Sequence, residues 1–180
     1  MVCLPEHFAY MTNETAISGG KTYDFNDKLD QRLFQKYRQL ALDNQVWLSL
    51  GCFPERDPVT GNNYLTHSII SEEGNVVAKY RKMHMFDVDL LQQGGVSQRE
   101  SQQFVRGETL TEPCFSPVGY LGLSISYDIR FPELYRQLIL KGAQILLVPS
   151  AFLSKTGSSH WETLLRTRAL ENQCYVVAAA

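Results

Sequence analysis

The sequence has almost no excess of charge of either sign, and it lacks a long apolar run. Its 180 residues include 17 basic and 19 acidic side chains, which leaves a formal net charge of −2. A charge so close to zero gives no support for binding nucleic acid or an anionic membrane surface. No apolar run approaches the roughly 20 residues that a membrane-spanning helix needs. We therefore expect neither nucleic acid nor a membrane among the partners of this protein.

Cysteine is also scarce, and the cysteines are widely spaced: Cys3, Cys52, Cys114 and Cys174. They form no C-x-x-C pair, so the sequence gives no reason to expect a metal site. Most of them stand in apolar, strand-like stretches, which favours buried free thiols in a reducing compartment. We therefore predict a cytoplasmic location, with a mitochondrial one as the alternative. We expect no bound metal and no other cofactor.

What the sequence does contain is the composition of an ordinary globular domain. Hydrophobic residues make up 44% of the chain and charged residues 20%, as is typical of globular proteins. A chain of 180 residues is long enough to form one domain with a sizeable core. We find no internal repeat and no low-complexity segment.

Hydrophobic periodicity predicts a mixed α/β fold. Apolar residues recur at helical spacing in 28–43, where Asn26 or Asp27 can cap the helix, and two more helices are predicted at 132–141 and 160–172. Strands are predicted at 1–6, 46–53, 64–71, 75–80, 114–118, 120–126, 144–149 and 174–180. The segments between them read as loops, chiefly 7–27, 54–63, 87–107 and 150–159. Helices alternate with apolar strands at both ends of the chain, which favours a mixed sheet with helical cover.

The stretch 120–134 is where the remaining elements are organised. It begins as a strand and turns abruptly polar at Ser126, Asp128 and Arg130, and Pro132 then opens a helix. Open α/β sheets bind ligands outside the carboxyl ends of their strands, so this turn is a candidate site. From this stretch alone, the simpler interpretation is a turn that an Asp128–Arg130 pair keeps in order.

Polar side chains also follow other predicted strands. Glu6 and Ser150 each come after an apolar strand, as Ser126 does, and Lys82 ends a fourth strand. In a parallel-type sheet these ends converge on one edge. A carboxylate, an ammonium and a hydroxyl gathered there could carry out acid–base and nucleophilic chemistry. A set of unrelated surface charges fits the spacing equally well.

Five motifs, in this order along the chain, resemble the nitrilase (carbon–nitrogen hydrolase) superfamily. They are Leu4-Pro5-Glu6, Tyr80-Arg81-Lys82-Met83-His84, Glu100 with Gly107, the run 126–133 and His160-Trp161-Glu162. The later stretch 149–180 is most similar to the Nit amidase branch of that superfamily, and the resemblance covers nearly the whole chain. It implies a four-layer α-β-β-α sandwich and a Glu–Lys–Cys catalytic set.

Four positions of this sequence fall on the catalytic positions of the family. The resemblance implies that Glu6 is the general base and that Lys82 stabilises the tetrahedral intermediate. It implies that Glu100 positions that lysine and the substrate. Ser126 occupies the position of the nucleophile, where the family has cysteine. Leu65 departs as well, since the family usually has asparagine there.

Four more residues lie in or near these motifs. The Tyr127 N–H could donate a hydrogen bond to an oxyanion. His160 and Trp161 are expected to shape the wall of the substrate pocket, with core packing as the alternative for Trp161. For His84, we expect a role in ordering its loop rather than one as a second base.

Ser126 decides the functional interpretation. A thiol close to a carboxylate and an ammonium ionises readily, because its ordinary pKa is only about 8.5. A serine hydroxyl needs a histidine-type base instead, and Glu6 is too weak a base for that task. The run 122–126 does not match the G-x-S-x-G elbow of serine hydrolases. We therefore expect the site of an amidase with little or none of its rate.

Three functions stay open, in a fixed order of preference. The first is an amidase that resembles the Nit branch, acts on a small ω-amide such as deaminated glutathione and is blocked at Ser126. The second is a non-catalytic pseudoenzyme that binds a ligand or acts as a scaffold. The third is an α/β domain with an unrelated function. The resemblance also implies a homo-oligomer, a dimer or larger.

The resemblance further implies that residues 1–180 are a partial carbon–nitrogen hydrolase domain. Family members have a strand and a helix before the position of Met1 and more strands after that of Ala180. Sheets without those elements expose edges and apolar faces. We therefore expect the fold to be truncated at both ends and marginal as an isolated monomer.

Overall fold

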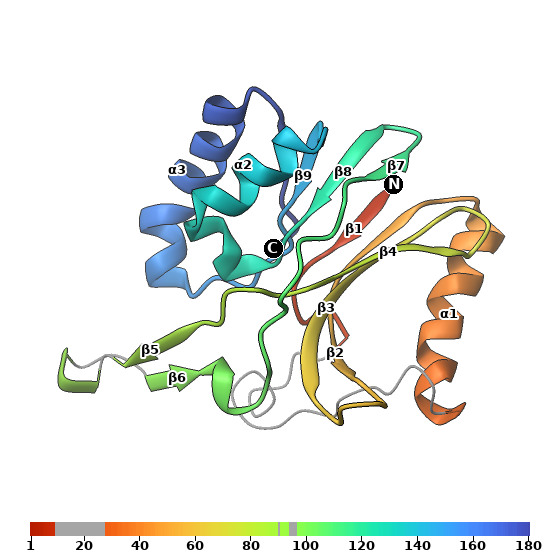
Figure 1. Cartoon of the computed structure of the whole chain (residues 1–180), viewed down its shortest axis with the longest axis horizontal. Coiled ribbons are helices and arrows are strands. Elements are labelled where there is room, and N and C mark those ends of the chain that lie inside the picture. Colours follow the sequence, from red (N-terminus) through yellow and green to blue (C-terminus); the bar gives the residue numbers. More distant parts are fainter. Residues whose placement is uncertain (10–27, 90, 94–96) are drawn as a thin grey trace.

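The computed structural model describes residues 1–9, 28–89, 91–93 and 97–180. In these ranges the chain forms ten strands, three α-helices and three short 3₁₀ helices (Figure 1). The predicted loop from residue 10 to 27 and the predicted cap at Asn26 or Asp27 lie outside the described residues. Among the helices that the structure describes, none is both long and apolar enough to cross a membrane.

The first sheet carries the strand order β1-β2-β3-β4. Its strands are β1 (Val2–Leu4), β2 (Leu48–Arg56), β3 (Asn63–Ile70) and β4 (Val76–Arg81). β1 pairs parallel with β2, and the other pairs are antiparallel. Helix α1 (Lys28–Asn44) covers one face, where the rings of Phe34 and Tyr37 both meet Phe53 edge to face at 5.9 Å. The predicted helix at 28–43 and the predicted hairpin of 64–71 with 75–80 are confirmed.

The second sheet carries the order β10-β9-β8-β7. Its strands are β7 (Cys114–Ser116), β8 (Gly119–Leu123), β9 (Ile145–Leu147) and β10 (Tyr175–Val177). β7 and β8 form an antiparallel hairpin, and the remaining pairs are parallel. Helices α2 (Pro132–Leu140) and α3 (Ser154–Asn172) lie on the outer side of this sheet (Figure 1).

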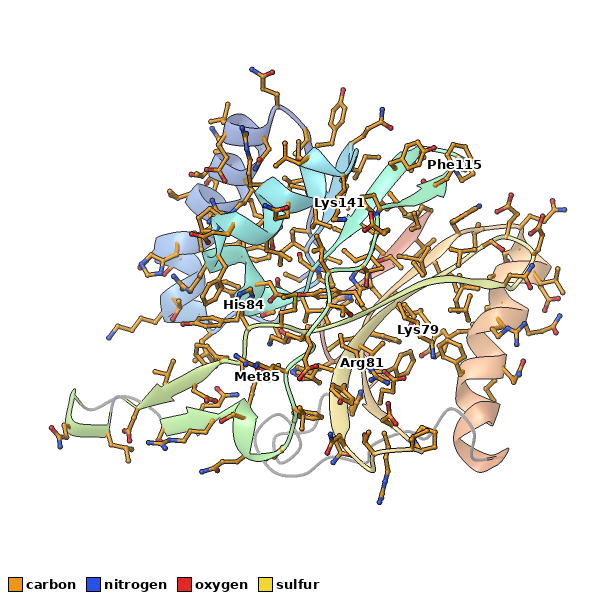
Figure 2. All side chains as sticks on the ribbon, in the orientation of Figure 1. Lys79, Arg81, His84, Met85, Phe115 and Lys141 are labelled. Carbon is orange, nitrogen blue, oxygen red and sulfur yellow. The ribbon has the colours of Figure 1, made fainter. Side chains whose placement is uncertain are left out.

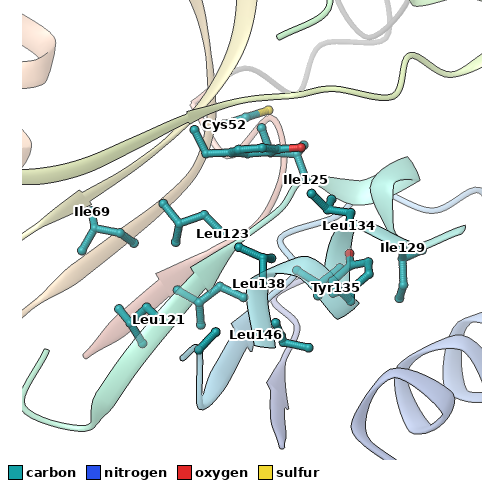
Figure 3. Packing of buried hydrophobic residues seen from close by; sticks show 14 of the residues in the cluster. Cys52, Ile69, Leu121, Leu123, Ile125, Ile129, Leu134, Tyr135, Leu138 and Leu146 are labelled. Atoms are coloured by element: carbon teal, nitrogen blue, oxygen red, sulfur yellow. The ribbon is translucent and has the colours of Figure 1, made fainter. Parts of the chain in front are cut away.

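The main core fills the space between the two sheets and continues on the outer side of the second sheet, under α2. Ile69 and Tyr80 from the first sheet pack in one buried cluster with Leu121 and Leu123 from β8 and with Leu138 from α2 (Figure 3). α1 packs on the far side of the first sheet in a separate cluster. The layers therefore run helix, sheet, sheet, helix, and the predicted α-β-β-α sandwich is confirmed.

Two predicted loops contain regular structure. The loop at 87–107 includes a small hairpin, β5 (Asp87–Asp89) with β6 (Ser97–Arg99), and two 3₁₀ helices, η1 (Leu91–Gln93) and η2 (Glu100–Gln102). Its three-residue strands have no apolar alternation that could reveal them. The loop predicted at 150–159 is also too long, because α3 begins at Ser154. The hydroxyls of Ser158 and Ser159 both donate to the carbonyl of Lys155 at 3.1 Å, so these residues fit the helix despite their low propensity.

Candidate active site

The ends of three strands bring together the residues that the sequence singled out. Glu6 follows β1, and Lys82 directly follows β4. β8 ends at Leu123, three residues before the predicted strand end, and Ser126 instead begins a 3₁₀ helix, η3 (Ser126–Arg130). Glu100 begins η2, at the base of the β5–β6 hairpin.

The backbone that leads to Glu6 passes unusually close to β2. A Cβ atom on Gly51 would lie 2.2 Å from the carbonyl oxygen of Pro5 and 2.4 Å from that of Leu4. No side chain fits such a gap, so only glycine allows β1 to reach this position. The sequence therefore places Glu6 partly through a residue on the neighbouring strand.

The backbone of Lys82 is held from both sides. Its N–H donates to the Leu65 carbonyl at 2.8 Å, and its own carbonyl accepts from the Gly107 N–H at 2.7 Å. A Cβ on Gly107 would lie 2.3 Å from the carbonyl oxygen of Arg81, so this contact also requires glycine. Leu65 itself is fully buried in the core and supplies only its backbone here.

Lys82 lies between two carboxylates and has almost no contact with solvent. Its Nζ donates to Glu6 Oε1 at 3.2 Å and to the carboxylate of Glu100 at 2.9 Å. The side chains are 1%, 3% and 12% exposed for Lys82, Glu6 and Glu100. The second oxygen of Glu6 accepts from the Ala151 N–H at 2.9 Å, and Glu100 accepts from the Phe86 N–H at 2.8 Å. Every charge in this buried triad therefore has a partner, as buried charges require.

Burial and charge act in opposite directions on the triad. Burial opposes the charge on Lys82, but the attraction of Glu6 and Glu100 outweighs it and raises the pKa of the ammonium. Burial also disfavours the charge on Glu6, yet Lys82, His7 and hydrogen bonds that include one from Ser126 lower its pKa below the ordinary value. For Glu100, burial and repulsion by Glu6 outweigh the attraction of Lys82, so its pKa is raised. Paired carboxylates whose pKa values move apart are typical of acid–base sites.

The backbone of Ser126 is in the left-handed region, with φ of 46°. This conformation is costly for a residue with a side chain and persists only where the surroundings hold it. The Ser126 N–H donates to the Pro149 carbonyl at 2.9 Å. Such strain is typical of functional sites. His7, which follows Glu6, has φ of 58° and lines the same cavity.

A cavity of about 250 Å³ opens beside the triad. Glu6, Glu100 and Ser126 line it together with the aromatic rings of Phe86, Tyr127 and Phe152 and with the guanidinium-bearing Arg130. The walls of the cavity are thus largely apolar and carry a few polar groups, as is typical of sites that bind small molecules.

The predicted substrate-binding residues fall into two groups. Tyr127 lines the cavity with Glu100. His160 and Trp161 are not among the lining residues, and each contacts a residue that is. Arg130 Nη2 lies 3.2 Å from His160 Nδ1, and the Trp161 ring is tilted against Phe152 at 4.7 Å. They support the cavity wall from behind.

The predicted Asp128–Arg130 pair is wrong. Asp128 accepts hydrogen bonds from the Tyr80 hydroxyl at 2.8 Å and from His84 Nδ1 at 2.7 Å, while Arg130 turns to His160. The sequence could not show this, because Tyr80 lies 48 positions from Asp128. His84 does order its loop, as expected. Figure 2 shows it on the segment between β4 and the β5–β6 hairpin, next to Met85.

Sequence reasoning missed several residues that line the cavity, among them His7, Phe86, Gln98 and Arg130. Adjacency to Glu6 was the one available signal for His7. Gln98 belongs to the hairpin that the sequence predicts as a loop, and Phe86 directly precedes that hairpin. In the described part of the chain, no group of three or more His, Cys, Asp or Glu side chains is placed to hold a metal ion.

A family profile described as carbon-nitrogen hydrolase matches residues 1–180 of the chain. The deaminated glutathione amidase of Dictyostelium discoideum is 50% identical over 188 residues, which cover all of this chain and 62% of the relative. The deaminated glutathione amidase of Bos taurus is 46% identical over 98% of this chain and 53% of its own length. The chain therefore spans between half and two thirds of the length of these curated relatives.

Solved structures of related proteins are similar to this chain in both fold and sequence. The NitFhit protein of C. elegans is 41% identical and superposes with a TM-score of 0.81 over 99% of this chain and 42% of its own. Nit3 of Saccharomyces cerevisiae, a member of the nitrilase superfamily, is 32% identical with a TM-score of 0.78. The match covers 98% of this chain and 60% of Nit3.

Proposed function

This chain belongs to the carbon–nitrogen hydrolase family, and from that membership we propose that its cavity is the site of a Nit-type amidase with serine at the nucleophile position. The buried Glu6–Lys82–Glu100 triad beside Ser126 carries this proposal. Glu6 acts as the general base, Lys82 stabilises the tetrahedral intermediate and Glu100 positions Lys82 and the substrate.

The proposed chemistry is blocked at Ser126. Amide hydrolysis in this site needs a nucleophile that attacks the carbonyl carbon while its proton passes to Glu6. Ser126 lines the cavity together with Glu6, whose pKa is below its ordinary value. A carboxylate of low pKa is a weak base for a hydroxyl, whereas a thiol ionises far more easily. We therefore expect substrate to bind without appreciable turnover.

We propose a small ω-amide such as deaminated glutathione as the substrate class. The names of the relatives support this choice. So does the cavity, since Arg130 offers a cation to a substrate carboxylate. The aromatic walls formed by Phe86, Tyr127 and Phe152 suit the apolar part of such a molecule. The Tyr127 N–H is the proposed oxyanion donor.

Ammonia release from deaminated glutathione and a panel of small ω-amides tests the proposal. The unaltered chain and its Ser126→Cys and Ser126→Ala variants are measured side by side. Turnover by the Ser126→Cys variant alone supports the proposal, and Ser126→Ala controls for background hydrolysis. Equal turnover by the unaltered chain and the Ser126→Cys variant would show that Ser126 does not block the reaction.

The alternative is a non-catalytic protein that keeps the cavity for binding. The observation in its favour is Ser126 itself, which stands in a cavity whose charged partners are all in place. Calorimetry separates the two functions: tight binding of an ω-amide with silence of both versions in the ammonia assay favours the binding protein.

Three broader features are proposed on the same footing. Residues 1–180 form a partial carbon–nitrogen hydrolase domain, and the protein works as a homo-oligomer, a dimer or larger. A cytoplasmic location agrees with four free cysteines, since disulfides are rare in reducing compartments.

A further inference from the structure

Asp128 is a buried carboxylate that the proposed chemistry does not use. Its side chain is fully buried, and a carboxylate in such a place is costly unless donors saturate its oxygens. Oδ2 accepts hydrogen bonds from the Tyr80 hydroxyl and from the Ile125 N–H, both at 2.8 Å. Oδ1 accepts from the His84 N–H at 3.1 Å and from His84 Nδ1 at 2.7 Å. Four donors therefore surround one carboxylate.

These donors come from two segments, and each segment carries a residue of the proposed site. Tyr80 and His84 lie two residues before and two residues after Lys82. Ile125 immediately precedes Ser126. A single carboxylate therefore ties the segment that presents the ammonium to the segment that presents the nucleophile position.

The same carboxylate also supports the strained backbone at Ser126. That residue has φ of 46°, a conformation that needs its neighbours to be fixed. The Ser126 N–H donates to the Pro149 carbonyl at 2.9 Å. One residue earlier in the chain, the Ile125 N–H donates to Asp128 Oδ2 at 2.8 Å, which fixes the preceding peptide.

We propose that Asp128 and His84 are positioning residues, which fix the Lys82 ammonium relative to the side chain of Ser126. The proposal rests on the proposed function, because it assigns them to the geometry of that site. Geometry of this kind matters strongly, since a displacement of about 1 Å can cost about 100-fold in rate.

The ring of His84 allows matched variants. It stacks on Phe131 with centroids 3.7 Å apart and planes 9° from parallel. Phe131 in turn meets Tyr127, which lines the cavity, edge to face at 5.6 Å. His84→Phe keeps an aromatic ring on Phe131 and removes the Nδ1 donor, whereas His84→Ala removes both. Comparing them separates the hydrogen bond to Asp128 from the stacking.

The test uses the thiol that Ser126→Cys introduces as a reporter, because its reactivity depends on the ammonium beside it. Alkylation of that thiol by iodoacetamide is followed as a function of pH, with peptide mass spectrometry to separate it from the four native cysteines. In this background, Asp128→Asn and His84→Phe are each expected to slow alkylation at neutral pH about tenfold and to move its midpoint to higher pH. Tyr80→Phe, which removes one of the four donors, should give a smaller shift in the same direction.

The direction of the shift distinguishes positioning from simple electrostatics. Removal of the negative charge at Asp128 without any change in geometry would favour the thiolate and move the midpoint to lower pH. A shift to lower pH in Asp128→Asn would therefore overturn the proposal. Glu133→Gln, which removes an exposed carboxylate at the start of α2, is the matched control and should leave the profile unchanged.

A purely structural role is recognised by a second readout. If Asp128→Asn, His84→Phe and Tyr80→Phe lower the melting temperature but leave the alkylation profile of the folded protein unchanged, the positioning role is excluded. His84→Phe and Tyr80→Phe carry the test if Asp128→Asn does not fold. Alkylation needs no turnover, so a silent ammonia assay, which would count against the proposed function, leaves this measurement intact.

Discussion

Removal of the Lys82 ammonium should strongly destabilise the folded protein. Lys82→Met keeps an unbranched side chain of similar length but leaves Glu6 and Glu100 facing each other without a counter-ion in a buried place. Breaking a buried ion pair in this way costs about 3–5 kcal/mol, because the remaining charge is uncompensated. We expect urea unfolding at neutral pH to show a loss of that size.

The control for this prediction is Lys79→Met. The Lys79 side chain is 39% exposed, and its Nζ lies 3.8 Å from Glu55 Oε1. Its removal should therefore lower the free energy of unfolding by no more than about 1 kcal/mol. The deficit of Lys82→Met should shrink in acid, where protonation neutralises the two carboxylates. Equal and small losses in both variants would mean that the triad is not a tightly coupled buried cluster.

His67 should make stability depend on pH. The residue is fully buried between the sheets, where Nδ1 donates to the Ser124 carbonyl at 3.0 Å and Nε2 accepts from the Ser49 hydroxyl at 2.8 Å. Burial lowers the pKa of His67 to about 4, only partly offset by the bond to Ser124. The unfolded chain takes up the proton near pH 6.5, before the folded protein does.

The contribution of His67 to the free energy of unfolding is therefore complete above about pH 6.5 and is lost as the pH falls towards about 4. The loss amounts to about 3 kcal/mol. His67→Gln keeps a donor and an acceptor but does not titrate. The free energy of unfolding, measured with urea across this pH range, should depend less steeply on pH for His67→Gln than for the unaltered protein. An equal dependence on pH in the two proteins would mean that His67 takes up its proton equally easily in the folded and the unfolded state.

How far the sequence predicts the site depends on the kind of residue. Glu6, Lys82, Glu100 and Ser126 could be placed together because each follows a recognisable strand or motif. Arg130 could not be placed in the site from the sequence, because the nearby Asp128 is a plausible partner for it. The side chains that bind Asp128 instead lie on β4 and on the loop after β4. Contacts between distant segments leave no local pattern that could reveal them.

At the scale of elements, Gly51 controls where β1 lies and so where Glu6 is held. Gly51→Ala would place a methyl group against the backbone oxygens of Pro5 and Leu4. Backbone cannot move aside as a flexible side chain can, so we expect a loss of at least about 2 kcal/mol in urea unfolding. Displacement of Glu6 should also abolish any ω-amide turnover that Ser126→Cys provides.

Gly157→Ala is the matched control for this prediction. Gly157 lies inside α3, and its added Cβ would meet only the Cβ of Phe152, at 3.6 Å, which is an ordinary contact. Since alanine favours helix over glycine by about 1 kcal/mol, this variant should be neutral or more stable. A loss in Gly157→Ala as large as that in Gly51→Ala would show that close backbone approach is not the cause.

The sequence predicts the elements well where apolar residues set the period. The helix at 132–141 begins at Pro132 as expected, and the paired strands β3 and β4 lie within two residues of their predicted bounds. The prediction fails where tertiary contacts override weak local preferences. The β5–β6 hairpin has polar strands, and the first turns of α3 contain glycine and serines, which favour loops in isolation.

At the scale of the whole molecule, both outer strands of the second sheet expose large apolar side chains. Phe115 on β7 is 65% exposed, and Tyr175 on β10 is 77% exposed. Exposed edge strands have unpaired backbone N–H and C=O groups, and their apolar side chains form a hydrophobic surface to which other chains can bind. We therefore expect this span to associate with itself as its concentration rises and to melt over a broad range.

Sedimentation velocity over a range of concentrations measures this association. Tyr175→Lys should weaken it by placing a charge on an edge strand, a device by which natural sheets avoid pairing. Val59→Lys is the control, since Val59 is 90% exposed but lies in the turn between β2 and β3, away from any sheet edge. If edge pairing drives association, Tyr175→Lys shifts the distribution towards the monomer and Val59→Lys does not. A monomer at all concentrations with one sharp melting transition would contradict the prediction, because it would mean that the exposed edges cost this fold little.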